Sequence, residues 1–176
     1  TEKETKANPI DQFATWWNEA VGAEIDEVNA MTLATASAGG VPSARIVLLK
    51  GFDGKGFVFF TNYHSYKGKD LEENPRACLV FFWKELERQI RITGLVRIGA
   101  WVSPQSEVIS GREWLEENEK KYQKENELHA LSRPPHWGGY RVIPITIEFW
   151  QGRSNRLHDR IQYSLQEDGE WKIERL

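Results

Sequence analysis

The sequence lacks most of what disulfides, metal centres and membrane spans require. It has one cysteine, Cys78, so no disulfide can form within the chain. Its four histidines show no H-x-x-x-H spacing and no C-x-x-C pair accompanies them, so we predict no metal site. No apolar run approaches the roughly 18 residues of a membrane-spanning helix. These absences favour a protein of the reduced cytoplasmic compartment with no membrane partner.

An excess of charge of one sign is also missing. The 23 Lys and Arg against 26 Asp and Glu give a formal net charge of -3, which offers no electrostatic reason to bind nucleic acid. At 176 residues and 20.4 kDa the chain fits one domain, which we place at residues 9–176 after a disordered, polar lead-in at residues 1–8. Its eight tryptophans predict broad aromatic surfaces in a core, a subunit interface or a ring-binding pocket.

The hydrophobic periodicity predicts a mostly β protein. Helical spacing predicts one helix that Asp11 caps and Gly22 ends, and further helices are expected at residues 65–73 and 111–126. Runs rich in β-branched and aromatic residues predict strands at residues 31–37, 42–50, 55–62, 77–83, 88–98, 140–150, 156–165 and 171–175. Many short antiparallel strands with helices at their edges predict a mainly β (α+β) fold built as a small barrel.

Three cations occupy alternate positions near the end of the chain: Arg156, His158 and Arg160. If this segment is a strand, its two-residue period puts all three side chains on one face, about 6.8 Å apart in succession. Like charges in a row repel, so the arrangement favours an opposing anion such as a phosphate. The alternative is a solvated edge strand that carries protective charge, with Asp159 on its other face.

The residues around this row, from Glu148 to Arg160, read E-F-W-Q-G-R-S-N-R-L-H-D-R, and the chain ends in W-K-I-E-R-L. They resemble the C-terminal hallmark of the pyridoxine/pyridoxamine 5′-phosphate oxidase family of FMN enzymes. The resemblance implies an FMN-binding split β-barrel with peripheral helices, present as a homodimer that holds the flavin at the subunit interface. It also implies a small phosphorylated pyridine substrate and O2 as reaction partners.

The segment from Arg45 to Lys50 looks like the family's R-x-V-L-L-K, whose ends contact FMN and whose lysine also reaches the substrate. The pleat of a strand sends Arg45 and Lys50, five residues apart, to opposite faces. A twist or a bulge would be needed for both to serve one ligand. Without the resemblance, this segment would be a core strand with charged ends.

Phe60-Thr61 and Ser65-Tyr66-Lys67 resemble the family's Y-T-N…S-R-K, which holds the flavin phosphate. A lysine and a serine near a helix N-terminus also suit an anion without any resemblance, although they serve equally as a helix cap and a surface charge. Tyr66 stands where the family usually has arginine, and Phe60 where it often has tyrosine. Tyrosine donates one hydrogen bond and carries no charge, so either the affinity for the FMN phosphate is weaker or its contacts shift to Arg45, Lys67 and Arg160.

Further motifs concern the flavin ring. Gln89 matches the glutamine of L-E-R-Q, and the period of a strand puts Glu87, Gln89 and Arg91 on one face. Gln105 and Ser106 match a segment that reaches the flavin of the partner subunit. The resemblance assigns FMN binding to Arg45, Ile46, Val47, Leu48, Leu49, Lys50, Phe60, Thr61, Tyr66, Lys67, Gln89, Gln105, Ser106, Trp150 and Arg160.

The activity that the resemblance implies is oxidation of pyridoxamine or pyridoxine 5′-phosphate to pyridoxal 5′-phosphate, with O2 reduced to H2O2. It assigns substrate binding to Lys50, Arg156, Leu157 and His158, with Arg156 and His158 as the catalytic residues. One alternative is a related split-barrel oxidase of another aromatic substrate, of the phenazine-biosynthesis type. Another is a non-catalytic flavin- or haem-binding protein, against which the retained R-L-H argues, since a pure binder needs no substrate contacts.

One family segment is missing. Between Ile98 and Gly99 the family normally carries an extra stretch that includes Y-F-x-S-R-P-R-x-S, whose tyrosine, arginine and serine bind the substrate phosphate. Either the protein lacks it or the printed sequence omits it. We favour omission, because the sequence resumes in register with G-A-W-V-S.

Overall fold

The structure is a computed structural model, and it describes residues 5–98, 137–153 and 158–176. Several predictions fall outside these ranges: the helix at residues 111–126, the junction between Ile98 and Gly99, and the site residues Gln105, Ser106, Arg156 and Leu157. They stay predictions. Among the helices that the structure describes, none is both long and apolar enough to cross a membrane.

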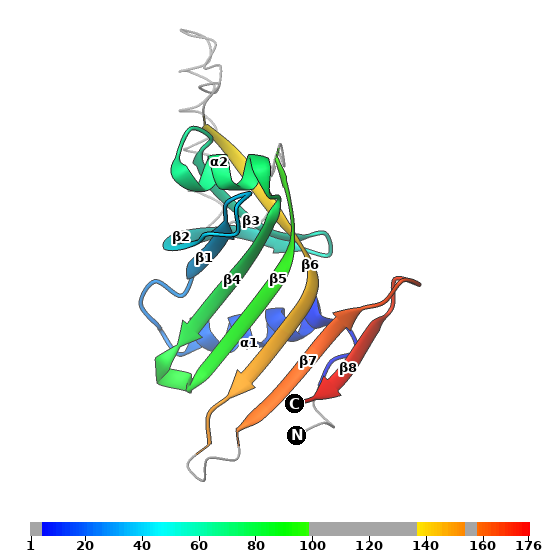
Figure 1. Cartoon of the computed structure of the whole chain (residues 1–176). Coiled ribbons are helices and arrows are strands. Elements are labelled where there is room, and N and C mark those ends of the chain that lie inside the picture. The colour runs from blue at the N-terminus through cyan, green and yellow to red at the C-terminus, as the bar shows by residue number, and fades with distance from the viewer. Residues whose placement is uncertain (1–4, 99–136, 154–157) are drawn as a thin grey trace, which may run out of the picture.

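The described strands form one antiparallel sheet in the order β3-β2-β1-β4-β5-β6-β7-β8. They are β1 (Ala30–Ala36), β2 (Pro42–Asp53), β3 (Gly56–Asn62), β4 (Arg76–Trp83), β5 (Arg88–Ile98), β6 (Trp137–Gln151), β7 (Asp159–Leu165) and β8 (Trp171–Arg175). Because β3 also pairs with β6, strands β1 to β6 close into a barrel, and the β7–β8 hairpin extends the sheet beyond it (Figure 1). The predicted mainly β (α+β) barrel with peripheral helices is confirmed.

Strand β6 joins the barrel to its extension. Residues 137–142 pair with β3, whereas residues 146–151 pair with β7. The register between β5 and β6 shifts next to Gly94, where a Cβ would lie 2.1 Å from the carbonyl oxygen of Ile143. Glycine permits this close approach, and the irregularity bends the strand. The end of β6 that carries Trp150 therefore leaves the barrel together with β7.

Helix α1 (Pro9–Gly22) begins three residues earlier than predicted. The side chain of Asn8, rather than Asp11, caps it by accepting a hydrogen bond from the Ile10 N–H at 2.8 Å. Pro9 suits the first helical position, because its missing N–H would have no partner there in any case. Asp11 lies in the first turn, where its charge favours the helix dipole.

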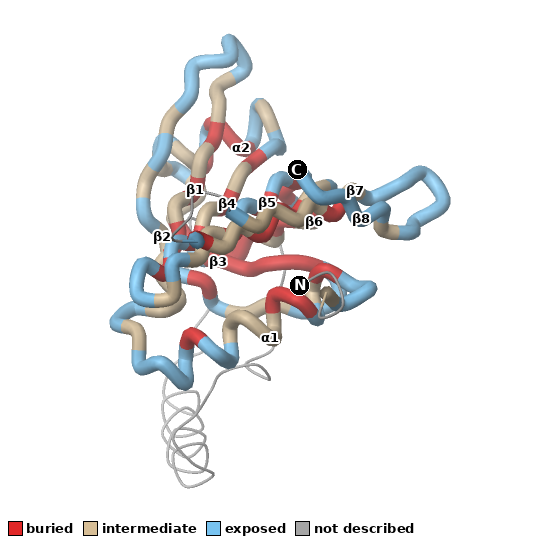
Figure 2. The backbone as a smooth tube through the Cα atoms, turned by 90° about the horizontal axis from the view of Figure 1, so that it is seen from below, coloured by how far each residue is buried: buried red, intermediate tan, exposed pale blue. Residues whose placement is uncertain are grey.

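The core lies between α1 and the barrel. Phe13 of α1 is completely buried, with its ring centroid 4.8 Å from those of Phe52 and Phe57 and 5.2 Å from that of Phe81. In Figure 1, α1 crosses behind β4 and β5. Figure 2 shows buried backbone concentrated in the strands and on parts of α1, whereas the tip of the β7–β8 hairpin is exposed.

Residues 5–8, which the sequence places in the lead-in, are hydrogen-bonded to the domain. The Lys6 N–H donates to Gln12 Oε1 at 3.0 Å, and the Lys6 carbonyl accepts from the Tyr163 hydroxyl at 2.7 Å. The chain is therefore attached to β7 before α1 begins.

Helix α2 (Tyr66–Glu73) lies at the end of the sheet opposite α1 (Figure 1). Ser65 caps it, with its Oγ accepting from the Gly68 N–H at 3.3 Å. A Cβ on Gly68 would lie 2.0 Å from the Tyr63 carbonyl oxygen. Only glycine allows the first turn of α2 to pack this closely on the segment that follows β3.

Two sequence predictions about strand faces need correction. β7 begins at Asp159, so His158 precedes the strand and does not share a strand row with Arg160. Glu87 also lies outside a strand, in the left-handed conformation with φ 52° at the turn before β5. In both places the chain changes direction between neighbouring strands, and a two-residue period applies only within a strand.

Candidate functional site

Arg45 lies beneath α2 and is held by several acceptors. Its Nη1 donates to Thr35 Oγ1 at 2.8 Å, and its Nη2 donates to Ser43 Oγ at 2.5 Å. Asp70 of α2 accepts from Thr35 Oγ1 at 2.6 Å and lies 3.9 Å from Arg45 Nη2. A buried carboxylate therefore balances part of the Arg45 charge.

The charge of Lys67, by contrast, is not balanced by any carboxylate that the structure describes. Its Nζ donates to Thr61 Oγ1 at 3.1 Å and to Ser65 Oγ at 3.3 Å, and within the described ranges no carboxylate forms an ion pair with it. Burial, followed by the nearby charge of Arg45, lowers the pKa of Lys67. A partly buried cation with only hydroxyl partners, beside a second cation and a helix N-terminus, fits an anion such as a phosphate.

The inner and outer faces of β2 differ as the pleat predicts. Arg45 is half-buried, whereas Lys50 is exposed. The register with β3 shifts between Leu49 and Gly51, so Lys50 lies at a bulge. Ile46 is 65% exposed on the outer face. The predicted FMN segment thus brings Arg45 and Lys50 to opposite sides of the sheet.

The two residues that depart from the family pattern are both exposed. The Tyr66 residue at the start of α2 is 85% exposed, and Phe60 of β3 is 40% exposed. The Tyr66 side chain therefore extends into solvent.

A second group of predicted residues lies on the outer face of β5, β6 and β7. Gln89 pairs with Trp150, and Trp150 pairs with Arg160, so the three occupy neighbouring positions in one row across the strands. The His158 ring lies beside Trp150, with 4.8 Å between the ring centroids. The structure therefore brings four residues of the predicted site together here.

Sequence reasoning missed the carboxylate that organises this group. Glu148 is only 4% exposed, and its Oε1 accepts from Nε and Nη2 of Arg160, both at 3.2 Å. Its Oε2 accepts from Arg91 Nη2 at 2.5 Å. The signal was present in the sequence, since Glu148 lies two residues before Trp150 and Arg91 two after Gln89, which puts both on the same face.

Ion pairs connect the end of β6, the start of β7 and the end of β8. Arg153 donates through Nε and Nη2 to Asp159 Oδ2 at 3.0 and 2.8 Å, and Arg175 Nη1 lies 3.4 Å from Asp159 Oδ1. These guanidinium groups lower the pKa of Asp159. The Arg153 N–H donates to His158 Nδ1 at 3.2 Å, so the neutral imidazole carries its proton on Nε2.

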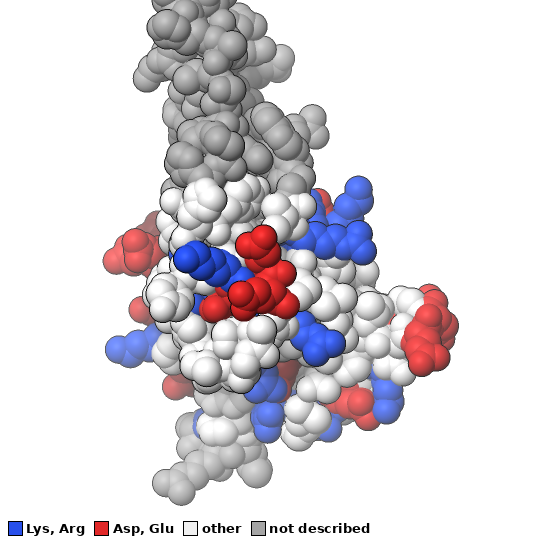
Figure 3. Space-filling model, turned by 45° about the horizontal axis from the view of Figure 1, so that its top comes forward, with Lys and Arg blue, Asp and Glu red and all other residues white. Residues whose placement is uncertain are grey.

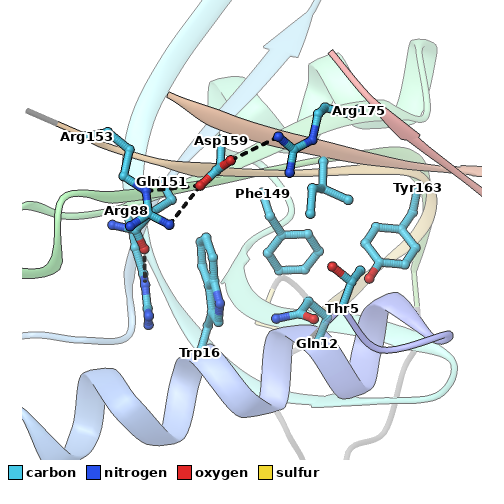
Figure 4. Close-up of a pocket in the computed structure, with 11 residues that line it drawn as sticks. Thr5, Gln12, Trp16, Arg88, Phe149, Gln151, Arg153, Asp159, Tyr163 and Arg175 are labelled. Carbon is cyan, nitrogen blue, oxygen red and sulfur yellow. Dashed lines mark hydrogen bonds and ion pairs between the residues drawn. The ribbon is translucent and has the colours of Figure 1, made fainter. Parts of the chain in front are cut away.

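A cavity of about 160 Å³ opens between α1 and the end of the sheet (Figure 4). Arg88 borders it, with its guanidinium carbon 4.4 Å from the Trp16 ring centroid, its Nε bonded to Gln151 at 2.8 Å and its Nη1 2.5 Å from a Glu19 carboxylate oxygen. Among the predicted FMN residues that the structure describes, none lines this cavity. The cavity is lined by Thr5, Gln12, Trp16, Arg88, Phe149, Gln151, Arg153, Asp159, Ile161, Tyr163 and Arg175.

The two groups of predicted site residues lie on different faces of the sheet. Arg45 pairs with Leu33, which is completely buried, and so belongs to the inner face. Gln89 pairs with Phe82, which is 62% exposed, and so belongs to the outer face. On the side seen in Figure 3, basic and acidic side chains are intermingled, so charge acts there locally rather than as one basic field.

Two family models match the sequence. One, described as pyridoxamine 5′-phosphate oxidase, covers residues 18–151, and the other, described as the pyridoxine 5′-phosphate oxidase C-terminal dimerisation region, covers residues 137–176. A pyridoxine/pyridoxamine 5′-phosphate oxidase of Trichormus variabilis is 52% identical over 195 aligned residues, covering 100% of this chain and 91% of that protein. The Cupriavidus necator protein of the same name is 50% identical, covering 100% and 92%. Both alignments are longer than this 176-residue chain, so these relatives hold residues without a counterpart here.

Solved structures show the same architecture. PhzG from Burkholderia lata, in complex with tetrahydrophenazine-1-carboxylic acid, superposes with a TM-score of 0.79 at 30% identity, covering 99% of this chain and 94% of that one. A pyridoxamine 5′-phosphate oxidase-related, FMN-binding protein of Nostoc punctiforme gives a TM-score of 0.67 at 15% identity, covering 90% and 93%, and supports the fold alone.

Proposed function

Because the chain belongs to the pyridoxine/pyridoxamine 5′-phosphate oxidase family, we propose that it uses FMN to oxidise pyridoxine and pyridoxamine 5′-phosphates to pyridoxal 5′-phosphate. The observation that carries the cofactor assignment is Lys67, a partly buried cation that has only hydroxyl partners among the described residues and lies beside Arg45. The phosphate of FMN would neutralise both cations. Thr61 and Ser65 would share its hydrogen bonds.

The row on the outer face suits the flavin ring. Gln89 offers both a donor and an acceptor to a ring edge, Trp150 offers an aromatic surface, and Arg160 offers a cation. When bound, FMN supplies the acceptor for the substrate hydride and passes the electrons to O2. The residues present therefore fit both ends of this cofactor.

The substrate would lie beside His158 and Lys50. Since His158 Nδ1 accepts from the Arg153 N–H, its Nε2–H is available to donate to the substrate group at C4′. The alcohol reacts with O2 to give the aldehyde and H2O2, and the amine also consumes water and releases ammonia. Arg156 and Leu157 remain predicted substrate contacts.

We also propose that the working enzyme is a homodimer. The match to a C-terminal dimerisation region supports this, and so do the exposed apolar side chains of Ile46, Leu48 and Phe82 on the outer face. In one subunit the phosphate-binding cations Arg45 and Lys67 lie on the inner side of the sheet, whereas the row of Gln89, Trp150 and Arg160 lies on its outer face. A flavin between two copies would contact the cations of one copy and the row of the other. A cytoplasmic location stays a prediction.

The experiment is to load the purified protein with FMN, remove free flavin, and supply either phosphorylated substrate. We expect a yellow dimer that forms one H2O2 for each pyridoxal 5′-phosphate, with ammonia released only from the amine. Pyridoxine without its phosphate is the matched control and should react far more slowly. Failure to retain FMN, or flavin retention without pyridoxal 5′-phosphate, would overturn the proposal.

The likeness to PhzG supports a second candidate, an oxidase of a tricyclic aromatic substrate. A reduced phenazine carboxylic acid belongs in the same assay. Oxidation of that compound, with both pyridine phosphates left unchanged, would decide for this alternative.

A further inference from the structure

Glu148 is a buried carboxylate on a sheet face that is otherwise partly open to solvent. It is 4% exposed, whereas the side chains of its two partners, Arg91 and Arg160, are 48% and 41% exposed. Both carboxylate oxygens are used: Oε1 accepts from Arg160, and Oε2 accepts from both Arg91 and Arg160. Two guanidinium groups on one carboxylate leave a net positive charge at this place.

The contact fixes the orientation of Arg160. Its Nε and Nη2 both donate to Glu148 Oε1, which leaves Nη1 without a hydrogen-bond partner among the residues that the structure describes. Arg160 is directly opposite Trp150, and Trp150 is directly opposite Gln89. Glu148 thus holds Arg160 in the row that would receive a planar ring.

A stabilising ion-pair network is the simpler explanation of this trio. Stability alone, however, does not call for a buried carboxylate. Removing its charge from water costs several kcal/mol, and packed apolar residues at such positions are often equally stabilising. Apolar side chains do occur on this face of the sheet, as Ile46 of β2 and Phe82 of β4 show. The burial of Glu148 therefore favours a role in directing its two arginines.

We propose that Glu148 is a positioning residue of the flavin site, acting through Arg160, with Arg91 as the second cation that holds the carboxylate in place. This inference rests on the proposed function, because it takes FMN as the group bound beside Arg160. Glu148 itself touches no cofactor. Its contribution is to fix a guanidinium before the ligand arrives, which lowers the ordering cost of binding.

The test replaces Glu148 by glutamine, which keeps the shape but leaves one acceptor oxygen for two arginines. FMN titration of the flavin-free protein should show a dissociation constant raised on the order of tenfold, as expected for the loss of a charge-assisted hydrogen bond. Glu174→Gln is the matched control. Glu174 lies in the same cross-strand row, opposite Gln162, which is opposite Glu148, but it is exposed and paired with Lys172 at 2.7 Å. Its replacement should leave FMN affinity unchanged.

The direction of the change in FMN affinity distinguishes a positioning role of Glu148 from a purely electrostatic one. If Glu148 acted only as a negative charge, Glu148→Gln would make the face more positive, tighten FMN binding and raise the midpoint potential of bound FMN. If it positions Arg160, binding weakens and the potential falls, because the cation is no longer held beside the flavin. Tighter binding, or unchanged affinity with a lower melting temperature, would overturn the inference.

A second variant protects the test against misfolding. Arg160→Lys keeps the cation and the buried carboxylate but loses the Nε and Nη2 fork. We expect it to weaken FMN binding as much as Glu148→Gln, whereas wild-type affinity in Arg160→Lys would overturn the inference. Wild-type protein that binds no FMN would instead overturn the proposed function, so the two failures are distinguishable.

Discussion

The α2 end of the barrel and the outer face of β5 to β7 both carry cations, but they neutralise them differently. At the α2 end, the polar partners of Lys67 within residues 5–98, 137–153 and 158–176 are the hydroxyl groups of Thr61 and Ser65. On the outer face, Glu148 binds both Arg91 and Arg160. Lys67 thus has no counter-charge in the described part of the chain, whereas Arg91 and Arg160 share a carboxylate that is buried.

This difference indicates what each region would contribute to ligand binding. An unneutralised cation gains most from an anion, so the α2 end should supply affinity for a phosphate. A cation that is already paired gains less charge stabilisation but is fixed in direction, so the outer face should supply orientation. Variants at the α2 end should therefore change FMN affinity more than variants on the outer face do.

The largest effect is expected for Lys67→Ala. Loss of a charged hydrogen bond to the phosphate should weaken FMN binding by about 1.5–3 kcal/mol, measured by titrating the flavin-free protein. Lys69→Ala is the matched control, because Lys69 is an exposed lysine of the same helix. Equal FMN affinity in the two variants would show that the phosphate lies elsewhere and would break the comparison.

The affinity for FMN should also fall at alkaline pH. Burial and the charge of Arg45 lower the pKa of Lys67 below the usual 10.5. Below this lowered pKa the lysine is charged in both the free and the bound protein, so binding does not depend on its titration. As pH rises through the lowered pKa, binding must take up a proton and weakens. The phosphate, with a second pKa of about 6, does not titrate there.

Lys67→Arg provides the control for this pH dependence. Its guanidinium stays protonated, so FMN affinity in this variant should stay level over the same alkaline range. For stability the sign is reversed. The fold disfavours protonated Lys67, so this cost is present below the lowered pKa and is relieved as pH rises toward 10.5. An alkaline loss of affinity in both variants would assign the titration to another group.

Much of the fold follows from local patterns. The predicted bounds of β5 and β8 agree with the structure, because in each strand the apolar alternation begins soon after a clear turn signal. The start of α1 was missed because Pro9 occupies the first helical position, which makes Asn8 the capping residue. The start of β7 was missed because the charge alternation includes His158, which lies outside the strand that begins at Asp159.

The candidate site was predicted less completely. The motifs marked residues expected to touch a ligand, such as Lys67 and Trp150. They did not mark the partner that holds them, because Arg91 and Glu148 are 57 positions apart and meet only through strand register. Register is set by closure of the whole barrel, which a local sequence pattern does not contain.

A smaller effect is expected for Tyr66→Arg. Tyr66 is exposed next to Lys67, and arginine would add a charge and a bidentate fork where phenol has one donor. FMN binding should tighten by about 1 kcal/mol, measured by the same titration. Tyr66→Gln, which adds a donor but no charge, is the control. Unchanged affinity in Tyr66→Arg would mean that Lys67 and Arg45 already satisfy the phosphate.

The smallest effect is expected for Arg91→Gln on the outer face. Its removal leaves Glu148 paired with Arg160, so the buried carboxylate keeps one cation. Because the Arg91 side chain is 48% exposed, solvent screens much of its attraction, and the free energy of unfolding should fall by only about 0.5–1 kcal/mol. Denaturant unfolding of the flavin-free protein measures this. A loss as large as that for Glu148→Gln would mean that both arginines are needed to keep the carboxylate buried, and the outer face would then depend on charge balance as strongly as the α2 end.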